Sequence, residues 1–187
     1  HLPNGNSFLR FHKPHKHGDN LLKFRYSVEL ANSELKYVEG FEQGRIENSY
    51  RFIRPLFYEG EHIGSVETSI AVNEIKEEIA KVFNSITVFL LRDSIVETKG
   101  FTKQAGLYIQ SDFDHYYYYN KGYRLFFNKK RQVNDSTIKR VNRKIAPEAQ
   151  PRINEFESFA MVSKVGGQHY ITTFLPISNI KKQQVAY

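Results

Sequence analysis

Hydrophobic and polar residues alternate along several short stretches near the start of the chain, which is the period-two pattern of β-strands. Residues 38–43, 50–57 and 62–72 show this alternation, and the glycine-containing segment 58–61 predicts a hairpin turn between the last two. Residues 6–13 show it as well, with two apolar residues on one face and an arginine and a histidine on the other. We therefore expect four strands in this part of the chain.

Two neighbouring segments instead repeat their hydrophobic residues at the spacing of an amphipathic helix. Residues 20–33 carry such a stripe, which includes Leu21 and Val28, and residues 73–83 carry a second one with acidic residues in its first turn. Pro55 lies inside the second of the clear strands and cannot donate a ladder hydrogen bond, so it predicts a bulge or an unpaired edge there.

The second half of the chain repeats the order of strand, helix and strands in a looser form. The expected elements are a kinked strand over 85–96, an aromatic stretch over 107–119, a short strand over 123–128, a helix over 135–144, a loop marked by Pro147 and Pro151, a hairpin over 156–176 that turns at Gly166-Gly167, and a last strand from Val185.

This order of elements predicts an α+β fold, because helices do not alternate regularly with strands. It fits two tandem PAS-like modules, each an antiparallel sheet flanked by helices, with a ligand cavity between sheet and helices. We expect residues 1–72 to form the first module, 73–84 a connecting helix and 85–187 the second module. A turn at residues 2–5 with no strand before it indicates that an N-terminal helix and strand of the first module are missing from this chain.

Composition and charge narrow the functional classes only partly. The 187 residues include no cysteine, which excludes disulfides, thiolate metal sites and cysteine nucleophiles, and no apolar run approaches the ~20 residues that span a bilayer. Lys and Arg number 27 against 20 Asp and Glu, so the net charge is +7. This excess and the tyrosine run 116–119 keep a nucleic-acid-binding module as an alternative from another class, but the basic residues are spread out and alternation puts only half of the rings on one face.

No enzyme motif is present, neither a phosphate-binding loop, a dinucleotide-binding fingerprint, a nucleophile elbow nor a zinc-protease helix. His12, His15 and His17 lie close together, and 112–115 holds two aspartates and a histidine. Pro14 and Gly18 place His15 and His17 in an exposed loop, and for both segments solvated loop histidines are favoured over a metal site. We therefore predict no catalytic residue, no metal and no cofactor, and a metal-dependent enzyme remains a further alternative.

Arginines interleaved with apolar residues give the sharper signal. A cavity that holds a few guanidinium groups can bind a carboxylate or phosphate in bidentate fashion, so we expect a small, anionic ligand. The glutamates among them can accept an amine or simply pair with the arginines in an internal ion-pair network. The candidate ligand-binding residues are Arg10, His12, Arg25, Glu42, Arg45, Arg51, Arg54 and Glu67.

Four sequence blocks, 1–21, 40–45, 51–57 and 64–67, resemble in order and spacing the double-Cache sensory domains of bacterial membrane receptors. The resemblance implies a periplasmic or extracellular ligand-sensing domain of an inner-membrane protein, flanked by transmembrane helices, and it is compatible with a homodimer. It also implies that this chain is not itself an enzyme and that a separate cytoplasmic domain carries the output. A histidine kinase is the favoured output, with a diguanylate cyclase or a chemoreceptor as alternatives, and the resemblance gives no reason to expect nucleic acid as a partner.

Overall fold

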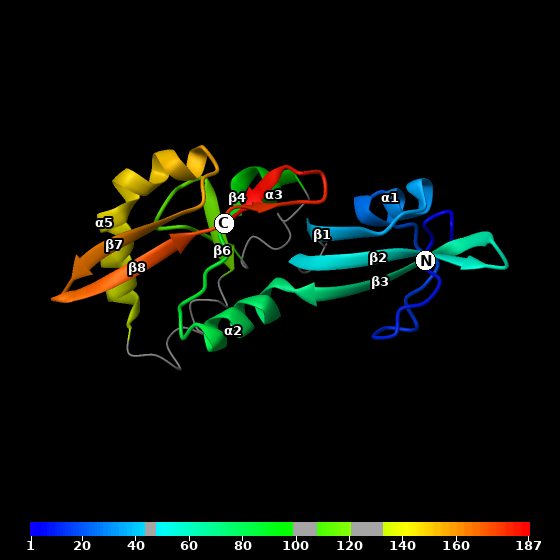
Figure 1. The fold of residues 1–187 in the computed structure, drawn as a ribbon, viewed down its shortest axis with the longest axis horizontal. Coiled ribbons are helices and arrows are strands. Elements are labelled where there is room, and N and C mark those ends of the chain that lie inside the picture. The colour runs from blue at the N-terminus through cyan, green and yellow to red at the C-terminus, as the bar shows by residue number, and fades with distance from the viewer. Residues whose placement is uncertain (44–47, 99–107, 121–132) are drawn as a thin grey trace. The chain divides into compact units, whose positions relative to one another are not determined.

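The computed structural model describes residues 1–43, 48–98, 108–120 and 133–187 (Figure 1). The chain divides into two compact units, the first made of residues 1–77 and 178–183, the second of residues 78–177 and 184–187. Both contain antiparallel strand pairs and helices, which confirms the α+β prediction. Among the described helices, none has the length and the apolar character needed to cross a lipid bilayer.

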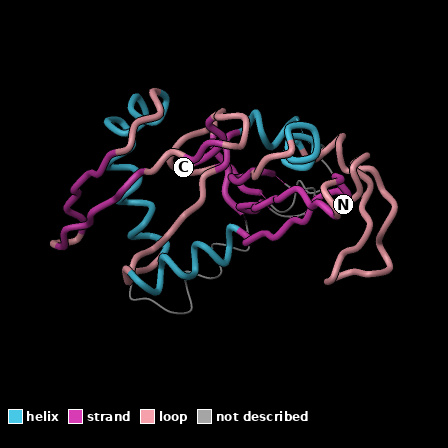
Figure 2. Tube along the Cα trace, turned by 45° about the vertical axis from the view of Figure 1, so that its right-hand side comes forward, coloured by secondary structure: helices cyan, strands magenta, loops and turns pink. Residues whose placement is uncertain are grey.

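A three-stranded antiparallel sheet, in the order β1-β2-β3, forms the framework of the first unit (Figure 2). Its strands are β1 (Val38–Gln43), β2 (Asn48–Tyr58) and β3 (Glu61–Ala71), which confirms the three strands expected here. Glu59 and Gly60 connect β2 to β3, and both have positive φ (49° and 86°). A two-residue turn of this kind matches the twist of the flanking strands.

Pro55 lies where β2 has only one partner strand. The pairing of β1 with β2 ends at Val38 opposite Ile53, whereas the pairing of β2 with β3 continues to Tyr58. The register of the β2–β3 ladder shifts between Leu56 and Phe57. Pro55 lies beyond the end of β1, so its missing N–H costs no ladder hydrogen bond on the β1 side. The prediction of a bulge or an unpaired edge near Pro55 is therefore confirmed.

The strand expected at residues 6–13 is wrong. This segment is an irregular loop that is tied back to residues 18–20 by Ser7 N–H donating to Asp19 O (2.9 Å) and Gly18 N–H donating to Ser7 O (2.7 Å). All residues from 11 to 20 are exposed, and Phe11 keeps 89% of its surface accessible. Alternating hydrophobicity predicts a strand only where a partner strand and a core face are available, and this loop has neither within the described residues.

Helix α1 (Tyr26–Glu34) packs on one face of this sheet and begins later than the expected helix at 20–33. Its buried side chains include Val28 and Ala31, and Ala31 contributes to a small core with Val38 and Ile53. A segment from the far end of the chain completes the unit, because Ile180 N–H donates to Phe41 O (3.2 Å) beside the isolated bridge between Phe41 and Asn179. No pattern in the sequence predicts this long-range contact.

Helix α2 (Val72–Val82) follows β3 without a break and confirms the expected helix at 73–83. The boundary between the two units falls inside α2, between Glu77 and Glu78. Lys76, which directly precedes Glu77 at this boundary, is a buried lysine.

The second unit holds short strands, a hairpin and a long helix. A five-stranded sheet runs in the order β5-β6-β4-β10-β9, with β5 (Tyr108–Gln110), β6 (Tyr117–Asn120), β4 (Leu91–Arg92), β10 (Gln184–Ala186) and β9 (Ile177–Ser178). The hairpin of β7 (Phe159–Val165) and β8 (Gln168–Phe174) turns at the glycine pair as expected, and β10 confirms the last strand. Along the tyrosine run, Tyr117 and Tyr119 are buried whereas Tyr116 is exposed, as alternation predicts.

The strand expected over 85–96 is mostly wrong. Only Leu91–Arg92 pairs as β4, and the chain then enters the short helix α3 (Asp93–Thr98). The Asp93 carboxylate accepts a hydrogen bond from Ser94 N–H (2.5 Å), and such local bonds favour a helix start over a continued strand. The strand expected at 123–128 and the basic cluster 129–131 lie outside the described residues.

Helix α5 (Asp135–Asn154) runs through both prolines that were expected to mark a loop, so this prediction is wrong. Pro147 and Pro151 are both exposed, so the carbonyl groups that they leave without a helical donor can bond to water. The opposite face holds the helix in the unit's main core through a stripe of residues four positions apart, which comprises Thr137, Val141, Ile145, Ala149 and Ile153. Burial of this stripe outweighs the low helix propensity of proline.

Candidate functional site

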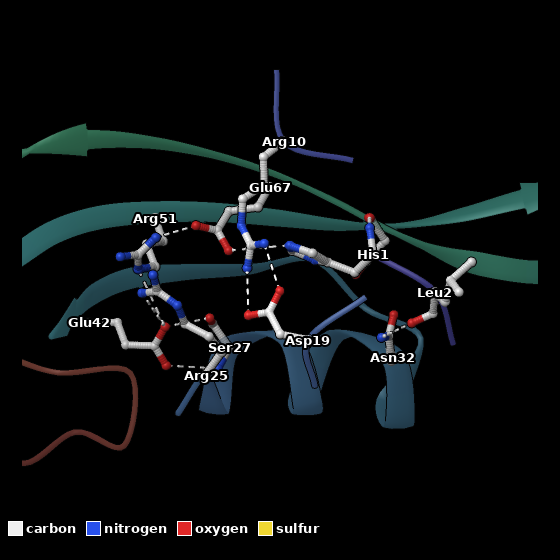
Figure 3. A network of polar contacts seen from close by, with 11 residues as sticks. His1, Leu2, Arg10, Asp19, Arg25, Ser27, Asn32, Glu42, Arg51 and Glu67 are labelled. Atoms are coloured by element: carbon white, nitrogen blue, oxygen red, sulfur yellow. Dashed lines mark hydrogen bonds and ion pairs between the residues drawn. The ribbon is translucent and has the colours of Figure 1, made fainter. Parts of the chain in front are cut away.

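Arg51, in the central strand of the first unit, is the middle of a network of charged side chains. Only 4% of Arg51 is exposed, and its guanidinium contacts Glu42 on β1 (Nε to Oε2, 3.4 Å) and Glu67 on β3 (Figure 3). The register explains the geometry, because Glu42 pairs with Ser49 and Glu67 pairs with Ile53, each two residues from Arg51. All three side chains therefore project from the same face of the sheet as diagonal neighbours.

Glu42 also closes the N-terminus of α1. Its carboxylate accepts hydrogen bonds from Ser27 N–H (3.0 Å) and from Ser27 Oγ (2.7 Å). Arg25, the N-cap residue of α1, makes no capping hydrogen bond with its own side chain. A carboxylate from a neighbouring strand thus satisfies one of the free N–H groups at the helix start, where the helix dipole also favours negative charge.

Arg25 contributes a second guanidinium to the same carboxylate. Its Nη1 atom lies 3.8 Å from Glu42 Oε2. Burial lowers the pKa of Arg25 below its ordinary value, and repulsion from Arg51 acts in the same direction, while Glu67 and Glu42 oppose it. Two arginines therefore lie close to each other on one face of a three-stranded sheet, and two glutamates hold them together.

Arg10 joins the network from the N-terminal loop. Its guanidinium makes a bidentate pair with Asp19 (Nη1 to Oδ1, 2.7 Å; Nη2 to Oδ2, 2.9 Å) and donates to Lys16 O (2.6 Å). The hydrogen bonds that Arg10 donates to Asp19 raise the pKa of Arg10, and the charge of Glu67 adds to the effect. The imidazole of His1 lies 3.8 Å from Glu67 on the other side (Figure 3).

The structure thus brings together most of the residues that the sequence suggested. The members that meet are Arg10, Arg25, Glu42, Arg51 and Glu67. His12 is instead exposed in the N-terminal loop, and Arg54 is exposed with its guanidinium 4.3 Å from the centre of the Tyr37 ring. Arg45 lies outside the described residues.

Three polar partners were missed by the sequence reasoning. Asp19 lies in the N-terminal loop and pairs with Arg10, and Ser27 reads as an ordinary residue of the first helical turn. His1 gave no signal at all. Only the packing of α1 and the N-terminal loop against the sheet brings these groups to the arginines, so the sequence offered no periodic pattern from which to find them.

Two donors of this network have no hydrogen-bond acceptor within the described residues. They are Arg25 Nη1 and Arg51 Nε, two buried atoms that lie 3.8 Å and 3.4 Å from Glu42 Oε2 without forming a hydrogen bond to it. The arrangement already binds one carboxylate and retains unused donors, which is chemistry suited to an additional anionic oxygen. Across the described parts of the chain, no group of three or more histidine, aspartate or glutamate side chains is arranged to hold a metal ion.

A separate cavity of about 410 Å³ lies in the N-terminal loop of the first unit. Its walls are mostly apolar or small, and none of the candidate residues predicted from the sequence lines it. The lining residues are Leu2, Asn6, Ser7, Phe8, Leu9, Pro14, His17 and Gly18.

Comparison with protein families matches residues 1–187 to the family dCache_3, described as a double sensory domain of two-component sensor kinases. The match covers the full length of both units. Comparison with curated proteins and comparison with solved structures each gave no match.

Proposed function

The chain belongs to the family of double sensory domains of two-component sensor kinases, and from this premise we propose that its first unit binds a small anionic molecule at the Arg25–Arg51 network. The family membership confirms the resemblance to double-Cache sensors. The anionic character of the ligand is our own inference from the side chains of the first unit.

The observation that carries the proposal is the convergence of donors on the Glu42 carboxylate. Ser27 supplies two hydrogen bonds, and the partly buried Arg25 and the buried Arg51 each add a guanidinium group with a buried N–H that has no hydrogen-bond acceptor among the described residues. A ligand carboxylate placed beside Glu42 would satisfy these donors by charge-assisted hydrogen bonds. Guanidinium groups keep their positive charge at any physiological pH, so this preference does not depend on pH.

Signalling requires that the ligand bind two arrangements of the unit with different affinity. The network can couple ligand binding to such a change through its two glutamates. Glu67 lies on β3, which continues into α2. Glu42 lies on β1, next to Phe41, whose carbonyl oxygen accepts a hydrogen bond from Ile180 N–H in the returning segment. A ligand that shifts these glutamates therefore acts on both connections that leave the sheet. A tenfold difference in affinity between two states changes their ratio tenfold, which is about 1.4 kcal/mol.

We place the chain outside the cytoplasm, as a periplasmic or extracellular domain of an inner-membrane protein with flanking transmembrane helices. The partner across the membrane is a histidine kinase domain, which carries the catalysis, while this chain binds its ligand without transforming it. The family description favours a kinase over a diguanylate cyclase or a chemoreceptor. A homodimer is the arrangement in which we expect the receptor to signal.

The test is a thermal-shift panel on the purified chain with acetate, succinate, citrate and the uncharged succinamide at constant ionic strength. A ligand that binds only the folded state raises the Tm, and at a fixed concentration a tighter ligand raises it more. We expect at least one carboxylate to raise the Tm and succinamide to leave it unchanged. Equal shifts for charged and uncharged compounds would contradict the anionic ligand.

A further inference from the structure

Two hydrogen-bond donors in the core of the second unit have no acceptor within the described part of the chain. They are the hydroxyl of Tyr117 and the Nε of Arg92, and both atoms are buried. Arg92 on β4 pairs directly with Tyr117 on β6. Residues opposite each other in an antiparallel pair project to the same face of the sheet, so the two side chains are neighbours.

An unpartnered tyrosine hydroxyl is unusual in this core. Tyr117 is 1% exposed, and a buried phenol normally finds a partner because a buried hydroxyl without a hydrogen bond destabilises the folded state. Tyr187 packs edge-to-face with Tyr117, and its hydroxyl reaches the carbonyl oxygens of Ile153 (3.2 Å) and Glu157 (3.1 Å). Burial raises the pKa of Tyr117 to about 12, so its hydroxyl remains a donor under physiological conditions.

The positive charge of Arg92 also has no ion-pair partner among the described residues. Its guanidinium carbon Cζ instead lies 5.2 Å from the centre of the Phe156 ring. The acidic groups that face this region are held by other donors. These pairs are Asp93 with Ser94 N–H (2.5 Å), Asp114 with Tyr116 N–H (2.7 Å) and Glu157 with Arg152 Nε (2.7 Å).

We propose that Arg92 and Tyr117 form a second ligand site, in the second unit, for a small monocarboxylate. The guanidinium supplies positive charge and an Nε–H donor, the phenol supplies an O–H donor, and both point to an acceptor oxygen on the ligand. The ring of Phe156 covers the guanidinium and offers an apolar surface to the body of the ligand. Asp93, Asp114 and Glu157 exclude a dianion by repulsion, which separates this specificity from that of the first unit.

The experiment is an NMR titration of the ¹⁵N-labelled chain with sodium acetate at constant ionic strength, and sodium phosphate serves as the dianionic comparison. In the wild type we expect saturable shifts of the amides of Arg92 and Tyr117 with acetate and weaker ones with phosphate. Tyr117→Phe removes only the unpartnered oxygen, so it should lower the acetate affinity at least about tenfold without loss of stability. Arg92→Gln should abolish the saturable shifts.

Tyr187→Phe is the matched control, because it removes a hydroxyl that is already bonded within the protein. We expect it to lower stability and leave the acetate affinity within about twofold of the wild type. Absence of saturable shifts in the wild type, unchanged affinity in Tyr117→Phe, or tighter binding of phosphate than acetate would each overturn the proposal. Arg25→Gln in the first unit should leave these shifts intact, so failure of one site can be told from failure of the other.

Discussion

Ser27 uses both of its donors to hold the carboxylate of Glu42, with the backbone N–H 3.0 Å from Oε1 and the hydroxyl 2.7 Å from Oε2. Both residues are buried, and the contact joins the first turn of α1 to β1. A carboxylate that is buried away from water is stable only with such partners. This contact therefore fixes the position at which Arg25 and Arg51 meet the Glu42 carboxylate.

Replacement of Ser27 by alanine removes the hydroxyl bond and leaves the backbone bond in place. A hydrogen bond to a charged group contributes about 1.5–3 kcal/mol, so we expect Ser27→Ala to lower the free energy of unfolding by that amount in urea denaturation. Ser33→Ala, in the exposed last turn of the same helix, is the matched control and should change it by no more than about 0.5 kcal/mol. Equal effects of the two variants would show that the Ser27 hydroxyl has no special role.

Arg51 and Arg54 lie on the same strand and offer a comparison of a buried with an exposed arginine. Arg51→Met leaves Glu42 and Glu67 without their shared cation, and the removal of one partner from a buried pair costs about 3–5 kcal/mol. Arg54→Met loses only a cation–π contact with Tyr37, which is worth about 0.5–1 kcal/mol at an exposed site. Chemical denaturation of both variants checks this, and a small effect of Arg51→Met would mean that the network contributes little.

The hydropathy pattern was sufficient for the three strands of the first unit because β1, β2 and β3 are neighbours in sequence and pair with each other. It failed at residues 6–13, where alternation is present but the loop has no core to cover. It failed again at α5, since a local reading treats Pro147 and Pro151 as breaks and cannot weigh them against a buried stripe that spans the whole helix. Burial, which decides both cases, is a property of the folded chain.

The candidate site was predictable to a similar degree. Arg51, Glu42 and Glu67 follow from strand pairing that the sequence indicates, so their meeting could be anticipated. Ser27 and Asp19 could not, because their roles depend on how α1 and the N-terminal loop settle on the sheet. Arg54 was included because it lies in the same strand as Arg51. Its side chain projects from the face of the sheet opposite to that of the buried Ile53, and it is exposed.

Proline at position 147 of α5 gives a direct test of the part of this helix, after residue 144, that the sequence did not predict. Pro147 is exposed in the helix interior, so alanine restores a helical hydrogen bond without disturbing the core. Proline is about 3 kcal/mol less favourable than alanine in such a position, and we expect Pro147→Ala to raise stability by about 1–3 kcal/mol. The Tm and the urea midpoint report the change. A decrease in both would indicate that the helix ends before Pro147.

Lys76 predicts a pH dependence of stability. It is 6% exposed, and burial lowers its pKa from 10.5 to about 7, with Glu77 opposing the shift. Between these two values the unfolded chain binds one more proton than the folded chain, so the contribution of Lys76 to stability rises with pH across this window and is least favourable below pH 7.

Lys76→Met removes this dependence and keeps the length of the side chain. We expect the variant to be more stable than the wild type at pH 7, and its advantage to shrink by roughly 1.4 kcal/mol per pH unit as the pH rises through the window. Urea denaturation at a series of pH values measures the difference. Lys81→Met, at an exposed position of the same helix, is the control and should change the free energy of unfolding by a small amount that does not vary with pH. A pH-independent difference for Lys76→Met as well would contradict the lowered pKa of Lys76.

The most direct test of an anion site in the first unit is calorimetric titration of three proteins with the carboxylate that raises the Tm most: the wild type, Arg25→Gln and Arg54→Gln. Arg25 contributes a buried donor without an acceptor, whereas Arg54 has the same charge but lies exposed outside the network. For the site in the first unit we predict saturable binding in the wild type, an affinity at least about tenfold lower in Arg25→Gln, and an affinity within about twofold of the wild type in Arg54→Gln. Equal loss in both variants, or no loss in either, would contradict a ligand site at the network.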